Sequence, residues 1–272
     1  MGPNPALPIH PLAADLLAER DLLVEAAEAA GALALPFFHG SVQSWEKEDD
    51  AGPVSEADMA VNSALETHLL GARPGYGWLS EESEDGAARL AAERVFIVDP
   101  IDGTRAFLKG ETGFAVAVAL VEAGRVIAST VHLPARGETY AAALGAGATL
   151  NGEPIAPSPR HELEGATALG AKASYRAEHW PGGAPPVERI FRHALEWRLC
   201  MIADGSFDLM VTMRDAFEWD VAAGALIASE AGARITDRDG EELRFNAAFP
   251  KVPGVIVAPP ALHQALMALR LG

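Results

Sequence analysis

Apolar and small residues recur near helical spacing at the start of the chain, which predicts a long Ala-rich helix over Pro11–Leu35. Pro11 suits the first turn of such a helix, where its missing N–H is not needed. A second helix is expected over Asp58–Leu70, since its apolar residues share one face. The positions that carry these patterns are Leu12, Leu16, Leu23 and Ala27 in the first helix, and Val61, Leu65 and Leu69 in the second.

Strand patterns follow in the middle of the chain. Alternation or β-branched runs predict the strands Val95–Val98, Gly113–Val121, Arg125–Leu133 and Glu138–Leu144. The first of these ends at Asp99, and the second places on one face Phe114, Val116, Val118 and Leu120. Short turns join the last three strands into a meander. We therefore expect an antiparallel sheet with helices on one face.

The stretch Gly145–Pro159 is rich in glycine, proline and turn residues, and we place the junction of two subdomains near it. An N-terminal α+β subdomain over residues 1–150 and a C-terminal α/β subdomain over residues 151–272 are expected. Strand patterns beyond the junction cover Thr167–Gly170, Trp197–Ile202, Asp208–Thr212 and Val255–Ala258. Helical patterns cover Pro186–Leu195, Asp220–Ala231 and Ala261–Leu271.

The 272 residues carry a formal net charge of −17, which argues against nucleic acid polymers and anionic membranes as partners. No apolar run approaches the ~18 residues that a membrane helix needs, and no signal-peptide pattern opens the chain. Cys200 is the only cysteine, which excludes an intramolecular disulfide and fits a cytoplasmic location. Part of the acidity could form a cage for divalent cations, because a bound cation inverts the local electrostatics.

The strongest local signal is the segment Asp-Pro-Ile-Asp-Gly-Thr from Asp99 to Thr104. A hydrophobic strand delivers Asp99 to its end, and Asp102 follows closely enough for both carboxylates to meet one cation. Gly103 lets the backbone approach a ligand, and Thr104 opens a helix whose free N–H groups suit a phosphate. Hard oxygen ligands beside a phosphate are typical of a magnesium site.

Two motifs with similar spacing are excluded. A calcium loop needs acidic groups at alternate positions and a late Glu, which are absent. The haloacid dehalogenase pattern separates its two Asp residues by one residue, whereas two residues separate Asp99 from Asp102. The alternative that remains is a turn in which both carboxylates only cap a helix.

Three further segments carry acidic residues, and each has a purely structural alternative. Glu81 opens a pair of glutamates that could be a solvated loop. Asp58 stands three residues after Ser55, as in a capping box. Asp220 follows Trp219 and could be the N-cap of a helix with small residues.

The order and spacing of all four segments closely resemble the inositol monophosphatase family, the lithium-sensitive, metal-dependent phosphatases. The similarity runs from about Leu16 to about Leu262. The family pattern is a Val-Thr/Ser…Asp segment, a Gly-Glu-Glu loop, Asp-Pro-Ile/Leu-Asp-Gly-Thr, and Trp-Asp before small residues. Ser80 replaces the usual Gly before Glu81. The resemblance implies a mixed α+β and α/β fold, layered as an αβαβα sandwich of the sugar-phosphatase type, with most metal ligands in the N-terminal subdomain.

The resemblance also implies a metal set of two or three Mg²⁺ ions, with Mn²⁺ as a substitute. Glu81 and Asp99, with the Ile101 carbonyl, hold one ion. Asp99, Asp102 and Asp220 hold a second, and a weaker third ion shares Glu81.

Catalytic and substrate-binding roles follow from the same resemblance. Thr104 and Asp58 orient and help activate the attacking water, and Glu81 acts with them. Thr104 can accept a hydrogen bond from that water while its own proton goes to Asp58. Phosphate and substrate contacts are assigned to Gly103, Thr104, Arg105 and Asp220.

Substrate choice is expected to lie in the second half. Inositol phosphatases usually carry a Gly-Ser/Thr-Ala run where this chain has His193–Arg198. Arg105 directly after Thr104 is more similar to the branch that acts on 3′-phosphoadenosine 5′-phosphate, which favours a 3′(2′),5′-bisphosphate nucleotidase. Inositol-1-monophosphatase is the alternative, followed by fructose-1,6-bisphosphatase and histidinol phosphatase. Cations for a second phosphate, each with an ordinary surface cation as its alternative, are Arg105, Lys109, Lys172, Arg198 and Arg214.

Two non-enzymatic functions are the alternatives to a phosphatase. One is a metal-binding interaction protein that keeps the family fold, and the other is a structural magnesium protein. A degenerate family member would have lost metal ligands, whereas this chain keeps all of them, so the sequence favours the enzyme. The expected partners are a small phosphorylated metabolite and, from the resemblance alone, a second copy in a homodimer.

Overall fold

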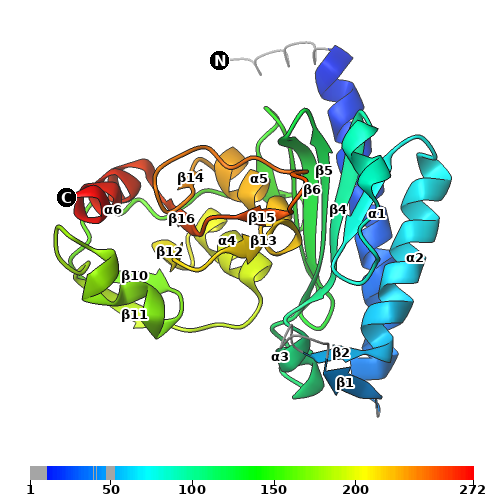
Figure 1. The fold of residues 1–272 in the computed structure, drawn as a ribbon, viewed down its shortest axis with the longest axis horizontal. Coiled ribbons are helices and arrows are strands. Elements are labelled where there is room, and N and C mark those ends of the chain that lie inside the picture. Colours follow the sequence, from blue (N-terminus) through cyan, green and yellow to red (C-terminus); the bar gives the residue numbers. More distant parts are fainter. Residues whose placement is uncertain (1–10, 39, 41, 47–52) are drawn as a thin grey trace, which may run out of the picture.

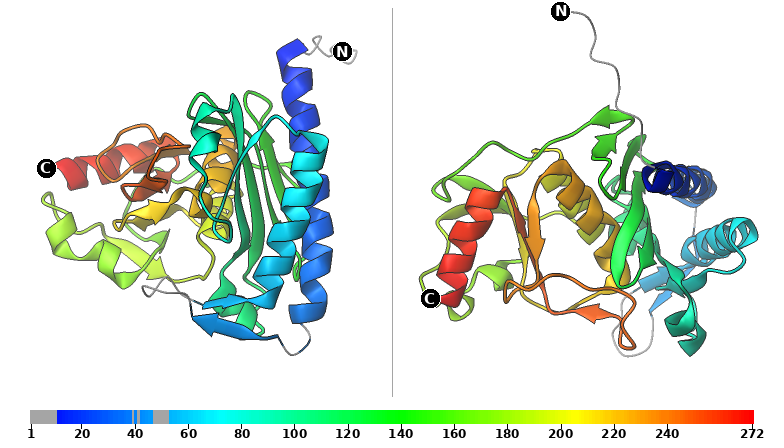
Figure 2. Two further views of the ribbon diagram at one scale, coloured as in Figure 1. Left: turned by 45° about the vertical axis from the view of Figure 1, so that its right-hand side comes forward. Right: turned by 90° about the horizontal axis from the view of Figure 1, so that it is seen from above.

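The computed structural model describes residues 11–38, 40, 42–46 and 53–272, the side chains of residues 11–14 excepted. Helical and sheet layers alternate across the molecule, as helix, sheet, helix, sheet and helix (Figures 1 and 2). The expected αβαβα layering is therefore confirmed. The helical layers are α1 (Pro11–Phe38) with α2 (Glu56–Ala72), α4 (Leu195–Ala203) with α5 (Ala222–Ala231), and α6 (Pro260–Leu271).

The N-terminal helices α1 and α2 form where their apolar faces predict them. Val61, Leu65 and Leu69 of α2 are fully buried, as are Leu23 and Ala27 of α1. Both helices run slightly past the predicted bounds, and α1 continues through Pro36. They pack on each other and on the first sheet, so that sheet has one of its faces covered.

The first sheet has seven strands in the order β3-β4-β5-β6-β7-β8-β9. Its strands are β3 (Gly77–Ser80), β4 (Arg94–Asp102), β5 (Ala115–Glu122), β6 (Arg125–Leu133), β7 (Glu138–Ala143), β8 (Ala148–Leu150) and β9 (Glu153–Pro154). The predicted meander is confirmed, and β8 and β9 extend it. The expectation of a purely antiparallel sheet is wrong, because β3, which the sequence did not reveal, pairs with β4 in parallel.

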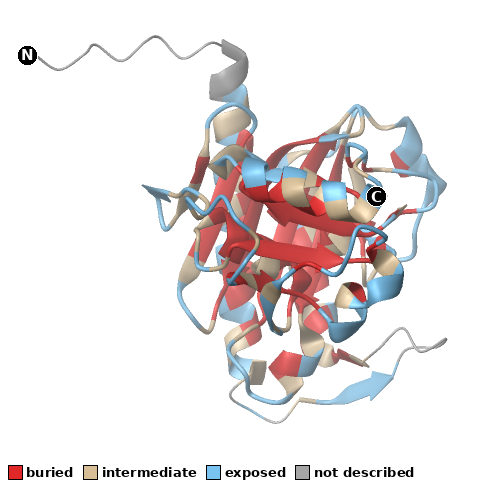
Figure 3. Cartoon of the chain, turned by 90° about the vertical axis from the view of Figure 1, so that its left-hand side faces the viewer, coloured by how far each residue is buried: buried red, intermediate tan, exposed pale blue. Residues whose placement is uncertain are grey.

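Helices cover both faces of this sheet, not the one face expected. Phe114 and the β5 residues Val116, Val118 and Leu120 pack into the core beneath α1 and α2. The alanines between them join the core that contains α4 and α5. The small side chains on this second face let the middle helices pack close to the sheet, and the strands are buried on both sides (Figure 3).

The second sheet has the order β11-β10-β12-β16-β14. Its strands are β10 (Ala166–Leu169), β11 (Val187–Ile190), β12 (Leu209–Thr212), β14 (Arg234–Thr236) and β16 (Val255–Ala258). Two predictions here are wrong. The strand expected over Trp197–Ile202 is helix α4, since a short buried apolar run fits either structure. The helix expected over Pro186–Leu195 is strand β11 followed by a loop.

Shorter elements complete the described fold. Two small sheets pair β1 (Ser44–Glu46) with β2 (Pro53–Ser55), and β13 (Ala216–Phe217) with β15 (Lys251–Val252). The remaining single-turn helices are α3 (Thr104–Leu108), η2 (Ala87–Ala91), η3 (Lys172–Tyr175), η4 (Ala177–His179) and η5 (Glu218–Asp220). The division at residue 150 stays a prediction, and β9 carries the first sheet to Pro154. Within the described ranges, no helix is both long and apolar enough to cross a membrane.

Candidate active site

The parallel pairing of β3 and β4 brings two predicted ligands to one edge of the first sheet. Ser80 pairs with Val98 in this ladder, so Glu81 and Asp99 are the next residues at the same end of neighbouring strands. The backbone N–H of Glu81 donates to the Val98 carbonyl at 3.2 Å, which holds the start of the loop against β4. The register thus explains why residues so far apart in sequence share a site.

An irregularity in β4 places the second aspartate. The strand was expected to end at Asp99, but it continues to Asp102, and its register with β5 shifts between these two residues. Gly103 then turns the chain with φ of 90°. A Cβ at Gly103 would lie 3.1 Å from the Gly113 carbonyl oxygen and 3.2 Å from Ala194 Cβ, so this left-handed turn requires glycine.

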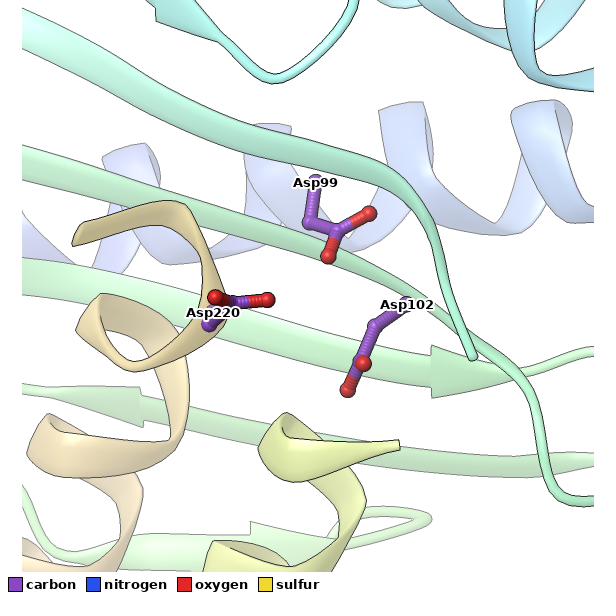
Figure 4. A group of neighbouring side chains, drawn as sticks. All are labelled: Asp99, Asp102 and Asp220. Atoms are coloured by element: carbon purple, nitrogen blue, oxygen red, sulfur yellow. The ribbon is translucent and has the colours of Figure 1, made fainter. Parts of the chain in front are cut away.

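Asp220 reaches the same place from the second half of the chain. It ends the short helix η5, just before α5. One carboxylate oxygen from each of Asp99, Asp102 and Asp220 lies within 4.8 Å of the other two (Figure 4). Asp99 and Asp102 are 1% and 6% exposed, so this is an interior cluster and not a solvated acidic surface.

The proximity of these carboxylates has an electrostatic cost. Burial raises the pKa of Asp102 to about 6 and that of Asp220 to about 7. Burial, with Glu81 and the other two aspartates, raises the pKa of Asp99 well above its usual range. Asp99 Oδ1 is buried without a hydrogen-bond partner among the described residues. A divalent cation would supply the missing partner and offset the repulsion, so this cluster could hold a metal.

Helix α4 fixes Asp102, and it does so with main-chain groups. The backbone N–H groups of Leu195 and Glu196 donate to the two Asp102 oxygens at 3.1 and 2.7 Å. The start of α4 therefore points at Asp102 (Figure 4). Asp102 caps a helix, as the structural alternative proposed, but that helix lies far along the sequence and not directly after it.

Glu196 links the same helix to α5, and sequence reasoning missed it. Its buried carboxylate accepts the backbone N–H groups of Ala223 and Gly224 at 3.1 and 2.5 Å. Glu196 therefore caps α5, the role that the structural alternative gave to Asp220. Asp220 Oδ2 instead accepts the Phe217 N–H at 3.3 Å. A lone acidic residue within an apolar run was the signal available in the sequence.

Asp58 and Thr104 form the expected pair. Asp58 Oδ2 accepts the Ser55 N–H at 2.8 Å and the Ser55 hydroxyl, so the capping arrangement exists. Its other oxygen, Oδ1, accepts the Thr104 hydroxyl at 3.3 Å, and that hydroxyl also lies 3.1 Å from the Ile101 carbonyl oxygen. Burial raises the pKa of Asp58, which is 1% exposed. One carboxylate thus both caps α2 and contacts Thr104.

The departure from the family pattern at Ser80 has a local explanation. The Ser80 hydroxyl donates to Asn62 Oδ1 at 2.6 Å, inside the protein. Asn62 Nδ2 in turn donates to Ser83 Oγ at 3.0 Å, as does Trp78 Nε1 at 3.1 Å. The loop that carries Glu81 is tied to α2 and β3 by this network, which argues against a freely solvated loop.

A cavity of about 940 Å³ opens over the aspartates. Its lining includes all of the predicted metal, catalytic and phosphate residues except Asp58. Of the five cations considered for a second phosphate, Arg105, Arg198 and Arg214 line the cavity, while Lys109 and Lys172 do not. Aromatic rings complete part of the rim, where Phe217 stacks on Trp219 with centroids 4.5 Å apart.

Comparisons with known proteins agree with this geometry. The profile of the family described as "Inositol monophosphatase family" matches residues 17–271. The inositol-1-monophosphatase of Rhizobium meliloti (strain 1021) is 36% identical over 233 residues, which cover 81% of this chain and 85% of the relative. The histidinol-phosphatase of Chlorobaculum parvum is 32% identical over 255 residues, which cover 91% and 94%. The Thermotoga maritima IMPase structure superposes with a TM-score of 0.80 at 27% identity, covering 93% of this chain and 97% of that one.

Proposed function

This chain belongs to the inositol monophosphatase family of metal-dependent phosphatases, and we propose that it hydrolyses a small phosphomonoester with water activated at Mg²⁺ ions. The observation that carries the proposal is the trio Asp99, Asp102 and Asp220, of which the first two are buried and the third is half-buried; one carboxylate oxygen of each lies within 4.8 Å of the other two. Glu81 completes the ligand set, together with the Ile101 carbonyl, at the same edge of the sheet. Two ions, or three, would occupy the set, and Mn²⁺ would substitute for Mg²⁺.

The bound cations supply Lewis acidity, which lowers the pKa of a water ligand and screens the negative phosphate. The chain itself positions the reacting groups. The Thr104 hydroxyl donates a hydrogen bond to Asp58 Oδ1 at 3.3 Å, so its oxygen is free to accept one from the attacking water. When the water loses a proton to Thr104, the Thr104 proton passes to Asp58. This acid–base help contributes roughly 10²–10⁴-fold to the rate. The backbone N–H groups of Gly103 and Thr104 bind the phosphate, with Arg105 beside them.

Two substrates are favoured by specific observations. A 3′(2′),5′-bisphosphate nucleotide such as 3′-phosphoadenosine 5′-phosphate fits a cavity that contains Arg105, Arg198 and Arg214 in addition to the metal ligands. Inositol 1-phosphate is supported by the names of relatives, among them the inositol-1-monophosphatase of Rhizobium meliloti. The cavity argument concerns this chain's own residues, so we place the bisphosphate first.

The remaining parts of the proposal rest on the family resemblance and on the single cysteine. They are a homodimeric state, sensitivity to lithium and a cytoplasmic location. Analytical ultracentrifugation of the purified chain tests the first, and a sedimentation coefficient of a monomer at micromolar concentration would contradict it.

A phosphate-release panel tests the function. It contains 3′-phosphoadenosine 5′-phosphate, inositol 1-phosphate, fructose 1,6-bisphosphate and histidinol phosphate, each with Mg²⁺, with Mn²⁺, with a chelator, and with Mg²⁺ plus Li⁺. We expect release that the chelator abolishes and Li⁺ reduces. Release that continues in the chelator would overturn the metal mechanism, and no release from any substrate would overturn the phosphatase.

A further inference from the structure

Arg198 is the least accounted-for charge in the cavity. Its side chain is half-buried on α4, and its guanidinium donates no hydrogen bond to any residue within the described ranges. Nε in particular is buried without a partner. The one side-chain contact that stands out is stacking, because the guanidinium carbon lies 5.4 Å from the centroid of the Phe191 ring. A buried charged donor without an acceptor costs free energy and calls for an explanation.

Arg214 carries a second guanidinium of this kind in the cavity. It lines the same cavity, is exposed, and forms no ion pair with a described residue. Both guanidiniums line one cavity, where they repel each other. Burial lowers the pKa of Arg198, the charge of Asp102 opposes this shift, and the positive charge of Arg214 adds to it. Two like charges placed together at a cavity wall favour an anion between them.

Neutralisation of the nearby aspartates is the competing explanation. Asp102 and Asp220 do attract Arg198. Asp102, however, already accepts two backbone N–H groups, and both aspartates belong to the proposed ligand set. Cations held in that set would neutralise the carboxylates and would leave the two arginines with uncompensated positive charge. The competing explanation therefore fails for the state that carries out hydrolysis.

Helix α4 relates the position of Arg198 to that of Asp102. Leu195 opens α4 and donates to Asp102, and Arg198 follows one helical turn later on the same side of the helix. Arg198 thus lies one helical turn beyond the residue whose backbone N–H holds the proposed metal ligand. Arg105 directly follows Thr104 and belongs with the phosphate that is hydrolysed, so it does not account for the arginines of the second half.

We propose that Arg198 and Arg214 form a subsite for a second anionic group of the substrate, a phosphate distinct from the one that is hydrolysed. This inference rests on the proposed function and names the substrate class for it: phosphomonoesters that carry a second phosphate, on a nucleoside or on a sugar. Guanidinium groups suit this task, because their planar donors match phosphate oxygens in pairs.

Matched substrates test the proposal. The first pair is adenosine 3′-phosphate and 3′-phosphoadenosine 5′-phosphate, and the second is fructose 1-phosphate and fructose 1,6-bisphosphate. For wild-type protein we expect kcat/KM at least about tenfold higher for the bisphosphate in one pair, which also tells nucleoside from sugar. Arg198→Met is expected to lower kcat/KM for that bisphosphate by about 10- to 100-fold, mainly through KM, and to leave its monophosphate within about threefold.

Further variants keep the test decisive. Arg198→Lys should recover part of the loss and Arg214→Met should repeat its direction, so a misfolded Arg198→Met would not end the test. Arg234→Met removes an equal charge from an exposed position outside the cavity, and it should leave both substrates unchanged. Equal rates within both pairs, or equal losses for mono- and bisphosphate in Arg198→Met, would overturn the subsite. Absence of release from all four substrates and from an aryl phosphate would instead overturn the phosphatase itself.

Discussion

Two groups of residues line the same cavity, and the protein holds them in place in different ways. The ligand group, Glu81, Asp99 and Asp102, sits at the ends of paired strands, and Asp102 is held by two main-chain hydrogen bonds. The arginine group, Arg198 and Arg214, projects from a helix and a loop of the second half, without hydrogen bonds from its guanidiniums to described residues. In the proposed mechanism the chemistry therefore depends on rigid main-chain placement, and the proposed selectivity depends on side chains that can change independently.

The largest expected effect comes from removing charge in the ligand group. Asp102→Asn keeps the shape but leaves one carboxylate fewer for a divalent cation, and we expect kcat to fall by at least about 10³-fold, or about 4 kcal/mol. Thr104→Ser keeps the hydroxyl that contacts Asp58 and should cost no more than about tenfold. Phosphate release at saturating Mg²⁺ measures both, with Asp215→Asn as an exposed control outside the cavity. Similar mild losses for Asp102→Asn and Thr104→Ser would contradict the two-metal assignment.

Acid should destabilise the outer layer of the second half through a histidine, separately from its effect on Asp102 and Asp220, whose pKa values are about 6 and about 7. His263 of α6 is 2% exposed and lies 2.9 Å from Thr236 Oγ1 of β14, and burial lowers its pKa to about 4. The unfolded chain binds this proton near pH 6.5, so between pH 6.5 and 4 protonation favours unfolding. Stability should therefore fall by about 3 kcal/mol as the pH drops through that window, and remain unaffected by this group above it.

Urea unfolding at pH 7 and pH 5 measures this effect. His263→Gln should lose most of the difference between the two pH values that His263 contributes. His161→Gln, at an exposed position, should keep all of it. An unchanged pH dependence in His263→Gln would show that other groups cause the acid sensitivity.

Glu196 links Asp102 to α5 and lies on α4 with Arg198, so its replacement tests how far the ligand group depends on these helices. Its carboxylate caps α5 behind Asp220, and its backbone N–H holds Asp102. Glu196→Gln offers one good acceptor in place of two, and we expect about a tenfold lower kcat and a higher Mg²⁺ concentration for half-maximal activity. Glu230→Gln is the matched control, because Glu230 likewise accepts two backbone N–H groups, from Gly145 and Gly147, outside the cavity. Equal effects of the two substitutions on the Mg²⁺ requirement would show that Glu196 has no special relation to the metal set.

The sequence revealed one part of this architecture well and another poorly. The alternating residues of β5 predict part of the meander, and the segment from Asp99 to Thr104 predicts two of the carboxylates that the fold brings together. Both features depend on local spacing. The sequence predicts a strand where helix α4 lies, because its apolar run is short. The start of the helix is stabilised by Asp102, a residue distant in sequence. The capping of α5 by Glu196 could not be predicted from the sequence for the same reason, because only the folded chain brings Glu196 and the start of α5 together.

The spacing of residues in the sequence also could not show which of the five candidate cations line the cavity, whereas the fold does. The smallest expected effect tests this distinction. Lys109 and Lys172 are exposed and do not line the cavity, whereas Arg214 does. Lys109→Met and Lys172→Met should therefore change kcat/KM for a bisphosphate by less than about twofold, since an exposed charge outside the cavity is largely screened by water and by about 0.15 M salt. Arg214→Met should exceed that change under the same conditions. A loss in either lysine variant as large as that in Arg214→Met would mean that net positive charge, and not its placement in the cavity, governs the binding of the second phosphate.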